Sequence, residues 1–202
     1  MLKECIVHVG MHKTGSSSIQ DFFFGAELDG ITYLDMGGYS NHSGYLSTIL
    51  LEKPHLYHAH LSMGRGQDEV DKLRLRYLDK LRESIKRCTT ERMIISAEDL
   101  SHRSIGESGL MRLKHELAPY FEKISVIGYV RRPIDYVQSA FQQIVKEGSS
   151  SWFSWRDLPK IVPRYRGSFE PMDAVFGREN VTLIPFVKTN IKGGDVVVDF
   201  CE

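Results

Sequence analysis

Five short runs rich in β-branched and other apolar residues constrain the fold of this chain more than any other feature. They cover residues 5–9, 31–34, 93–96, 124–130 and 181–184. Most of these runs are nearly continuous rather than alternating with polar residues, which is typical of strands that are buried on both faces. A sheet of such strands needs helices on both sides to cover it.

Helical patterns separate these runs. Apolar residues from Val70 to Cys88 recur at helical spacing between charged residues. We expect further helices over residues 108–121 and after Pro133, since proline is favoured in the first turn of a helix. Strands that alternate with helices indicate right-handed βαβ units. The sequence therefore predicts an α/β fold, a three-layer αβα arrangement with a mostly parallel sheet, in a single domain over residues 1–202.

Composition excludes several classes of protein. The chain has 26 basic and 26 acidic residues, so it lacks the broad positive field of a general nucleic-acid binder or an anionic-membrane binder. No apolar run is long enough to span a bilayer, and the N-terminus has no signal-peptide pattern, so we expect a cytoplasmic protein. The cysteines Cys5, Cys88 and Cys201 are too scattered for a disulfide framework or a zinc site.

A glycine-containing turn follows the first run. Gly10 and Gly15 have the G-x-x-x-x-G spacing of a P-loop, and a serine-rich helix start comes next. Such a turn directs backbone N–H groups and the positive end of a helix at a phosphate. The residue after Gly15 is Ser16, where nucleotide-hydrolysing P-loops carry lysine, and the loop's lysine is Lys13. We expect a P-loop-like anion site here; the alternative is a serine N-cap with a surface lysine.

A second positive site follows the fourth run. Arg131 and Arg132 stand at its end, Pro133 opens a helix, and Ser139 lies about two turns along that helix. A planar guanidinium suits a pair of phosphate oxygens. The alternative is a surface arginine paired with Asp135 or Glu147. Because the carboxyl ends of parallel strands meet at one edge of a sheet, we expect this site to lie near Lys13.

Taken together, the two motifs resemble the cofactor signatures of the sulfotransferase family that uses 3′-phosphoadenylyl sulfate (PAPS). Those signatures are K-[ST]-G-[ST]-[ST] and R-x-P-x-x-x-x-x-S, and both fit this chain in order. The resemblance covers nearly the whole chain and is greatest to bacterial members acting on saccharides or small metabolites. It implies that PAPS is held by Lys13, Thr14, Gly15, Ser16, Ser17, Ser18, Arg131 and Ser139.

The resemblance also implies a sulfotransferase reaction and an assignment of roles. Lys13 stabilises the charge that builds on the leaving phosphate, so no metal is required. The acceptor hydroxyl needs a base, for which Glu98 after the third run is the first candidate and His12 the second. Glu98 could instead cap a turn, pair with an arginine or contact acceptor hydroxyls.

The polar stretch over residues 37–67 is expected to recognise a small-molecule or saccharide acceptor, since loops of this kind often bind the variable substrate. Asn41, His42 and Tyr45 are the predicted contacts. Residues His55, His58 and His60 lack a neighbouring carboxylate or cysteine, so a solvated or helix-packing cluster is expected rather than a metal site. Trp152 and Trp155 are interpreted as a satellite hydrophobic cluster, with a lid as the alternative.

Family members usually carry a further glycine- and lysine- or arginine-containing segment near the C-terminus that closes over the cofactor. We find no counterpart before Glu202, so we expect a domain that is C-terminally incomplete relative to the family. Two other functions stay open. One is a P-loop ATP-dependent small-molecule kinase, with Glu98 and Asp99 as an acidic magnesium-binding strand end. The other is an inactive nucleotide-binding or interaction module.

Overall fold

A single all-parallel sheet forms the centre of the protein. The computed structural model describes residues 1–146, 161–187 and 189–202, so Glu147, Trp152 and Trp155 lie outside the described residues. The strands are β1 (Leu2–His8), β2 (Ile31–Tyr33), β3 (Arg92–Ser96), β4 (Phe121–Val130) and β5 (Val181–Pro185). Their order is β2-β3-β1-β4-β5, and every neighbouring pair is parallel. The predicted α/β class and all five predicted strands are confirmed.

Helices connect the strands. They are α1 (Ser16–Phe23), α2 (Ser43–Leu50), α3 (His58–Ser62), α4 (Gln67–Lys86), α5 (Gly106–Leu117), α6 (Pro133–Lys146), α8 (Tyr165–Phe176) and α9 (Val196–Phe200), with 3₁₀ turns η1 (Pro54–Leu56), η2 (Glu98–Ser101), η5 (Arg178–Asn180) and η6 (Lys192–Gly194). The helix predicted over residues 108–121 ends earlier, at Leu117. Phe121 instead begins β4, where it pairs with Leu2 of β1, so sheet pairing ends the helical pattern.

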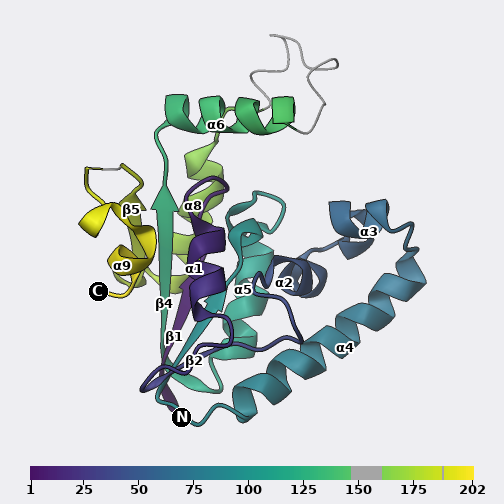
Figure 1. Cartoon of the computed structure of the whole chain (residues 1–202). Helices are drawn as coiled ribbons and strands as arrows, with labels where there is room; N and C mark the ends of the chain where they lie inside the picture. The colour runs from purple at the N-terminus through teal and green to yellow at the C-terminus, as the bar shows by residue number, and fades with distance from the viewer. Residues whose placement is uncertain (147–160, 188) are drawn as a thin grey trace.

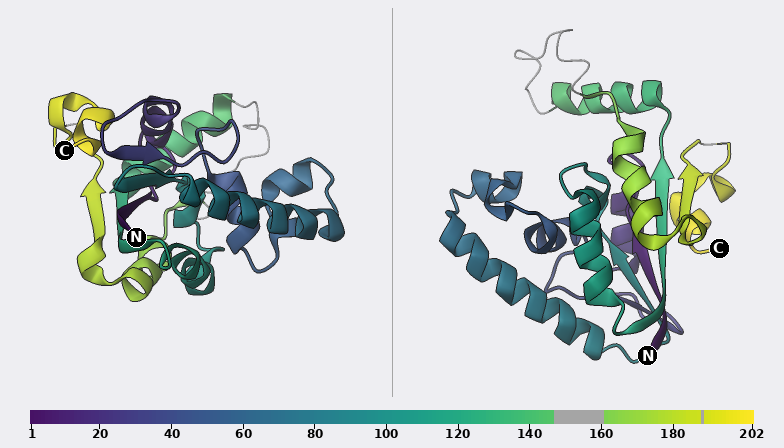
Figure 2. Two further views of the ribbon diagram at one scale, coloured as in Figure 1. Left: turned by 90° about the horizontal axis from the view of Figure 1, so that it is seen from below. Right: turned by 180° about the vertical axis from the view of Figure 1, so that it is seen from behind.

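The helices cover the sheet in two layers. Helices α1 and α9 lie on one face (Figure 1; Figure 2, left), and α5 and α8 lie on the other, where α2 and α4 join the same hydrophobic core. Successive residues of β1 accordingly enter different cores. Cys5 and Val7 pack into the cluster shared with α2, α5 and α8, whereas Ile6 packs against the cluster of α1 and α9. This alternation explains why the strands are apolar on both sides.

Helix α6 departs from this layered arrangement. It runs across the carboxyl end of β4 instead of lying on a face of the sheet (Figure 1), and none of its described residues is buried. Its side chain Gln143 accepts a hydrogen bond from Lys13 Nζ at 3.0 Å, so α6 lies over the loop that follows β1. The carboxyl ends of β1, β3 and β4 thereby form one rim, which carries the predicted site residues.

Candidate active site

The loop of residues 9–15 joins β1 to α1 and is held to β4 by its backbone. Val9 N donates to Ile127 O at 2.9 Å, and Met11 N donates to Tyr129 O at 3.3 Å. Thr14 is fully buried and its hydroxyl donates to Met11 O at 2.6 Å, so this side chain braces the loop from within. Lys13 has φ 68°, a left-handed conformation that costs a residue with a Cβ about 1–2 kcal/mol.

The first turn of α1 is open to a ligand. Its N-cap Gly15 has φ 80°, and a Cβ there would approach Val196 of α9 to 2.8 Å, so only glycine fits this turn. The helix start has no side-chain cap and no acidic residue. Ser17 and Ser18 are exposed, and Ser16 is buried with no hydrogen-bond partner for its Oγ among the described residues. Uncapped N–H groups, the helix dipole and an unpaired hydroxyl together suit a phosphate.

Lys13 and Arg131 meet at this rim, although 118 positions separate them. Arg131 Nη1 donates to Lys13 O at 2.8 Å, and its guanidinium lies 5.7 Å from the centre of the Phe186 ring. The neighbouring Arg132 differs, since it pairs with Asp135 at 2.7 Å and is exposed. The surface ion pair considered as an alternative for this segment therefore forms at Arg132, whereas Arg131 faces the loop.

Ser139 is less closely tied to this group. It lies on α6 and is half-buried. Within the part of the chain that the structure describes, no hydrogen bond joins it to Arg131 or to the loop. The structure thus brings Lys13, Gly15, the serines of α1 and Arg131 to one place, with Ser139 on the helix above them.

His12 bridges two carboxylates at the end of β3. Its Nδ1 lies 3.3 Å from Glu98 Oε2, and its Nε2 lies 3.1 Å from Asp99 Oδ1. Tyr57 donates its hydroxyl to Asp99 Oδ2 at 2.6 Å, and Asn41 Nδ2 donates to Glu98 Oε1 at 3.2 Å. We call His12, Glu98, Asp99 and Tyr57 the rim cluster.

The two carboxylates fix the charge of His12. Hydrogen bonds to Asp99 and then Glu98 raise the pKa of His12 to about 10, so its ring is an imidazolium at neutral pH. Burial alone would raise the pKa of Asp99, but the hydrogen bonds from His12 and Tyr57 outweigh it and lower that pKa. An imidazolium has no free lone pair to accept a proton. Both remain candidates of the sequence analysis, with His12 held in its charged form by the two carboxylates.

The predicted acceptor residues separate into three environments. Asn41 reaches the rim cluster through Glu98. His42 is fully buried, its Nδ1 accepts a hydrogen bond from Ser96 N at 3.1 Å, and its ring packs against Tyr33, so it is closed off from an acceptor. Tyr45 lies in a separate aromatic group with Tyr39 and Tyr77, and we find no contact between it and the rim cluster in the described residues.

A buried polar cluster lies beneath the rim and was not foreseen from the sequence. His8 Nδ1 and Ser96 Oγ are 2.7 Å apart, and Gln20 Nε2 donates to the same Oγ at 3.1 Å. Burial lowers the pKa of His8 and of His42 to about 4, so both rings are neutral at neutral pH. We call His8, Gln20, His42 and Ser96 the interior cluster. The sequence feature that could have indicated this cluster is that polar residues, His8 and Ser96, end two otherwise apolar strands.

The contact of His12 with Asp99 and that of Asp99 with Tyr57 were also missed. Asp99 stands beside Glu98 in the sequence, but Tyr57 comes from the segment between η1 and α3, and no local pattern connects it with β3. The contact exists only because the chain folds back across the rim.

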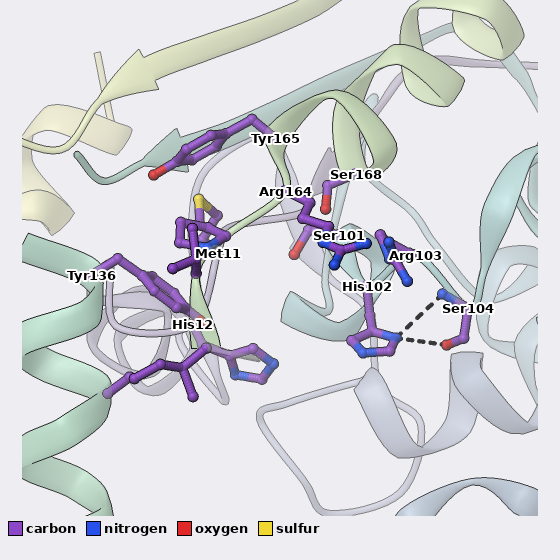
Figure 3. A pocket seen from close by; sticks show the side chains of 14 residues that line it. Met11, His12, Ser101, His102, Arg103, Ser104, Tyr136, Arg164, Tyr165 and Ser168 are labelled. Atoms are coloured by element: carbon purple, nitrogen blue, oxygen red, sulfur yellow. Dashed lines mark hydrogen bonds between the residues drawn. The ribbon is translucent and has the colours of Figure 1, made fainter. Parts of the chain in front are cut away.

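Two cavities adjoin His12. One, of about 710 Å³, lies between the loop after β1, η2, α6 and the start of α8, and its walls include His12 and Tyr136 (Figure 3). The other, of about 640 Å³, is lined by Asp99, Tyr57 and residues of η1. Burial, with the charge of Glu98 adding to it, raises the pKa of Tyr136.

The other predicted features concern metals and membranes. Among residues 1–146, 161–187 and 189–202, no three His, Cys, Asp or Glu side chains gather as a metal site. His60 packs between helices instead, with its Nε2 2.8 Å from Thr48 Oγ1. Within the same ranges no helix is both long enough and apolar enough to cross a bilayer.

Comparison with known proteins gives similarity in structure alone. The chain is similar to a sulfotransferase from Alicyclobacillus acidocaldarius, with a TM-score of 0.54 and 16% identity over 100% of this chain and 80% of that one. It is also similar to the sulfotransferase domain of the Synechococcus PCC 7002 olefin synthase, with a TM-score of 0.50 and 12% identity over 99% and 72% of the two chains. No protein-family model and no curated sequence matches it. At these identities the likeness establishes a shared fold.

Proposed function

We propose that this protein is a sulfotransferase that moves a sulfuryl group from PAPS to a hydroxyl of a saccharide or other small metabolite. The observation that carries this proposal is the meeting of Lys13 and Arg131 at one rim, joined by a 2.8 Å hydrogen bond. A donor with phosphates at both its 5′ and 3′ positions needs two adjoining positive sites. The segments after β1 and β4 supply them, because these two strands are parallel neighbours in the sheet. The fold shared with sulfotransferases supports the class.

The residues of the rim fit such a donor. The uncapped start of α1 and the unpaired Ser16 hydroxyl suit the 5′ phosphate, and Arg131 suits the 3′ phosphate. PAPS supplies the sulfuryl group when bound. Lys13 is the cation that stabilises negative charge on the departing phosphate, an interaction that strengthens as the bond to sulfur breaks.

Glu98 is the proposed base. Its carboxylate takes the proton of the acceptor hydroxyl while the acceptor oxygen bonds to sulfur. Asn41 and His12 each contact one of its oxygens and so fix its orientation. The imidazolium of His12 also offsets one of the two negative charges of Glu98 and Asp99, which would otherwise repel the transferring group.

The kinase alternative is less consistent with the rim cluster. A magnesium site needs carboxylates open to the ion, whereas Glu98 and Asp99 both face the His12 imidazolium. The inactive binding module would keep the same nucleotide site without turnover, so only an activity measurement separates it from the proposal.

Thermal unfolding with nucleotides tests the donor site. We expect adenosine 3′,5′-bisphosphate without metal to stabilise the wild type by about 2.7 kcal/mol at a concentration of about 100 Kd, a shift of roughly 5–10 °C. In Arg131→Ala the bisphosphate and adenosine 5′-phosphate should give equal shifts, and Lys13→Ala should weaken both. Arg132→Ala is the matched control, because Arg132 pairs with Asp135 and should keep the wild-type preference.

Other outcomes decide against the proposal. Stabilisation by ATP with magnesium alone would favour the kinase. Binding of the bisphosphate without sulfuryl transfer to any member of a saccharide panel would favour the inactive module.

A further inference from the structure

The cavity of about 710 Å³ beside His12 has an unusual charge. The whole chain balances 26 basic against 26 acidic residues, but no acidic residue is found among the described residues that line this cavity. Its walls include Arg103 and Arg164, whereas the charge of His12 is offset by Glu98 and Asp99. A wall with two guanidiniums in a protein of zero net charge attracts anions.

Two arginines occupy the wall away from Tyr136. Arg103 comes from the segment between η2 and α5, and Arg164 stands just before α8; both side chains reach into the same part of the cavity (Figure 3). Within the described ranges, neither forms an ion pair with a carboxylate. By contrast, Arg166, only two positions further on, lies 3.7 Å from Glu170.

The fold holds Arg103 against α8. A Cβ at Gly167 would lie 3.0 Å from Arg103 Cδ. The aliphatic part of the Arg103 side chain therefore packs directly against α8 at its glycine. Glycine inside a helix costs about 1 kcal/mol relative to alanine. Here it allows Arg103 to approach the first turn of α8, next to Arg164 and Ser168.

We propose that Arg103 and Arg164 form an anion subsite for the acceptor, so that the preferred acceptor is a saccharide carrying a carboxylate, phosphate or sulfate group. This inference rests on the proposed sulfotransferase function. Two guanidiniums on one wall, unpaired with any carboxylate of the described residues, repel each other unless an anion lies between them. Such an anion can accept hydrogen bonds from both guanidiniums and from the Ser168 hydroxyl. Of the rim cluster, His12 lines the same cavity and lies 3.3 Å from Glu98, so an acceptor anchored here is placed to present its hydroxyl toward Glu98.

The test compares acceptors that differ in charge. Methyl β-glucuronide and glucose 6-phosphate are the anionic probes, and methyl β-glucoside is the neutral one. Binding to the full chain is measured in the presence of adenosine 3′,5′-bisphosphate, and kcat/KM is measured with PAPS. We expect tighter binding and a higher kcat/KM for at least one anionic probe than for the glucoside, with the difference shrinking as salt increases.

Variants assign that preference to the two arginines. Arg103→Gln and Arg164→Gln should each reduce the ratio of anionic to neutral binding and kcat/KM by about tenfold, with affinity for the bisphosphate unchanged. Arg166→Gln is the matched control, since this arginine stands two positions after Arg164, in the first turn of α8, but does not line the cavity. The relative response to the two anionic probes tells carboxylate from phosphate recognition.

Each result decides the proposal. Equal binding of charged and neutral probes, a preference that survives in both variants, or a loss of bisphosphate affinity in them would overturn it. Arginine-dependent binding of an anionic probe without any sulfuryl transfer would support the subsite and count against the proposed reaction instead.

Discussion

The rim cluster and the interior cluster originate from the same two strand ends but hold their histidines in opposite states. His8 is the last residue of β1 and His12 follows four positions later, yet the pKa of His8 falls to about 4 while that of His12 rises to about 10. Burial lowers the first pKa more than the charge of Glu98 raises it, and contact with Asp99 and Glu98 explains the second shift. Depth below the rim formed by the carboxyl ends of the strands therefore separates the two kinds of group. The buried groups are neutral, and the groups at the rim are charged.

Glu98→Gln is expected to have the largest effect and to alter rate rather than stability. The amide keeps the size of the side chain but cannot take the acceptor's proton, so kcat/KM for sulfuryl transfer should fall by about 10²–10⁴. The free energy of unfolding should change little. Glu107→Gln, in the first turn of α5, is the control. Transfer at the wild-type rate by Glu98→Gln would place the base elsewhere.

Acid should unfold the protein through the interior cluster. The folded-state pKa of His42 is about 4 against an ordinary 6.5, so the unfolded state binds more protons between these values. Stability is thus retained above pH 6.5 and falls toward pH 4, by up to about 3 kcal/mol for this ring.

His42→Asn tests this dependence because its amide oxygen can accept from Ser96 N without titrating. Urea unfolding at pH 7.5 and pH 4.5 should give a smaller loss on acidification in the variant than in the wild type. Equal losses would mean that His42 is not held neutral by burial.

Ser96→Ala is expected to have an intermediate effect. It leaves His8 Nδ1 and Gln20 Nε2 without their partner in the interior, which should reduce the free energy of unfolding by about 2 kcal/mol. Ser62→Ala, an exposed serine on α3, should change it by less than about 0.5 kcal/mol. If the two variants proved equally stable in urea, the interior cluster would contribute nothing to stability.

His12→Gln should give the smallest effect on stability, with the opposite pH dependence. The raised pKa means that the stabilisation from His12 is fully present below pH 6.5 and is lost as the pH rises toward 10. The side chain is 45% exposed, so solvent screening limits this contribution to under about 1 kcal/mol. The difference between wild type and variant should therefore be larger at pH 6 than at pH 9.5. A difference that is constant or grows with pH would contradict the charged state assigned to His12.

Much of the architecture was predictable from local pattern. The apolar runs located all five strands, and the alternation with helices predicted a parallel sheet, because periodicity and turn chemistry depend on near neighbours. The spacing of Gly10 and Gly15 located the loop, and the residues after β4 located the second positive site. The end of α5 was misplaced, since pairing of Phe121 with Leu2 lies outside any local window.

The sequence by itself determined the order of strands and helices and where charged groups follow strand ends. Only the tertiary structure decided that Arg131 rather than Arg132 faces the loop, that His42 is buried, and that Asp99, bonded to Tyr57, contacts His12. The physical reason is that a side chain's charge state and partners depend on desolvation and on charges brought close by distant segments. Neither desolvation nor the charges from distant segments can be predicted from the residues adjacent to that side chain in the sequence.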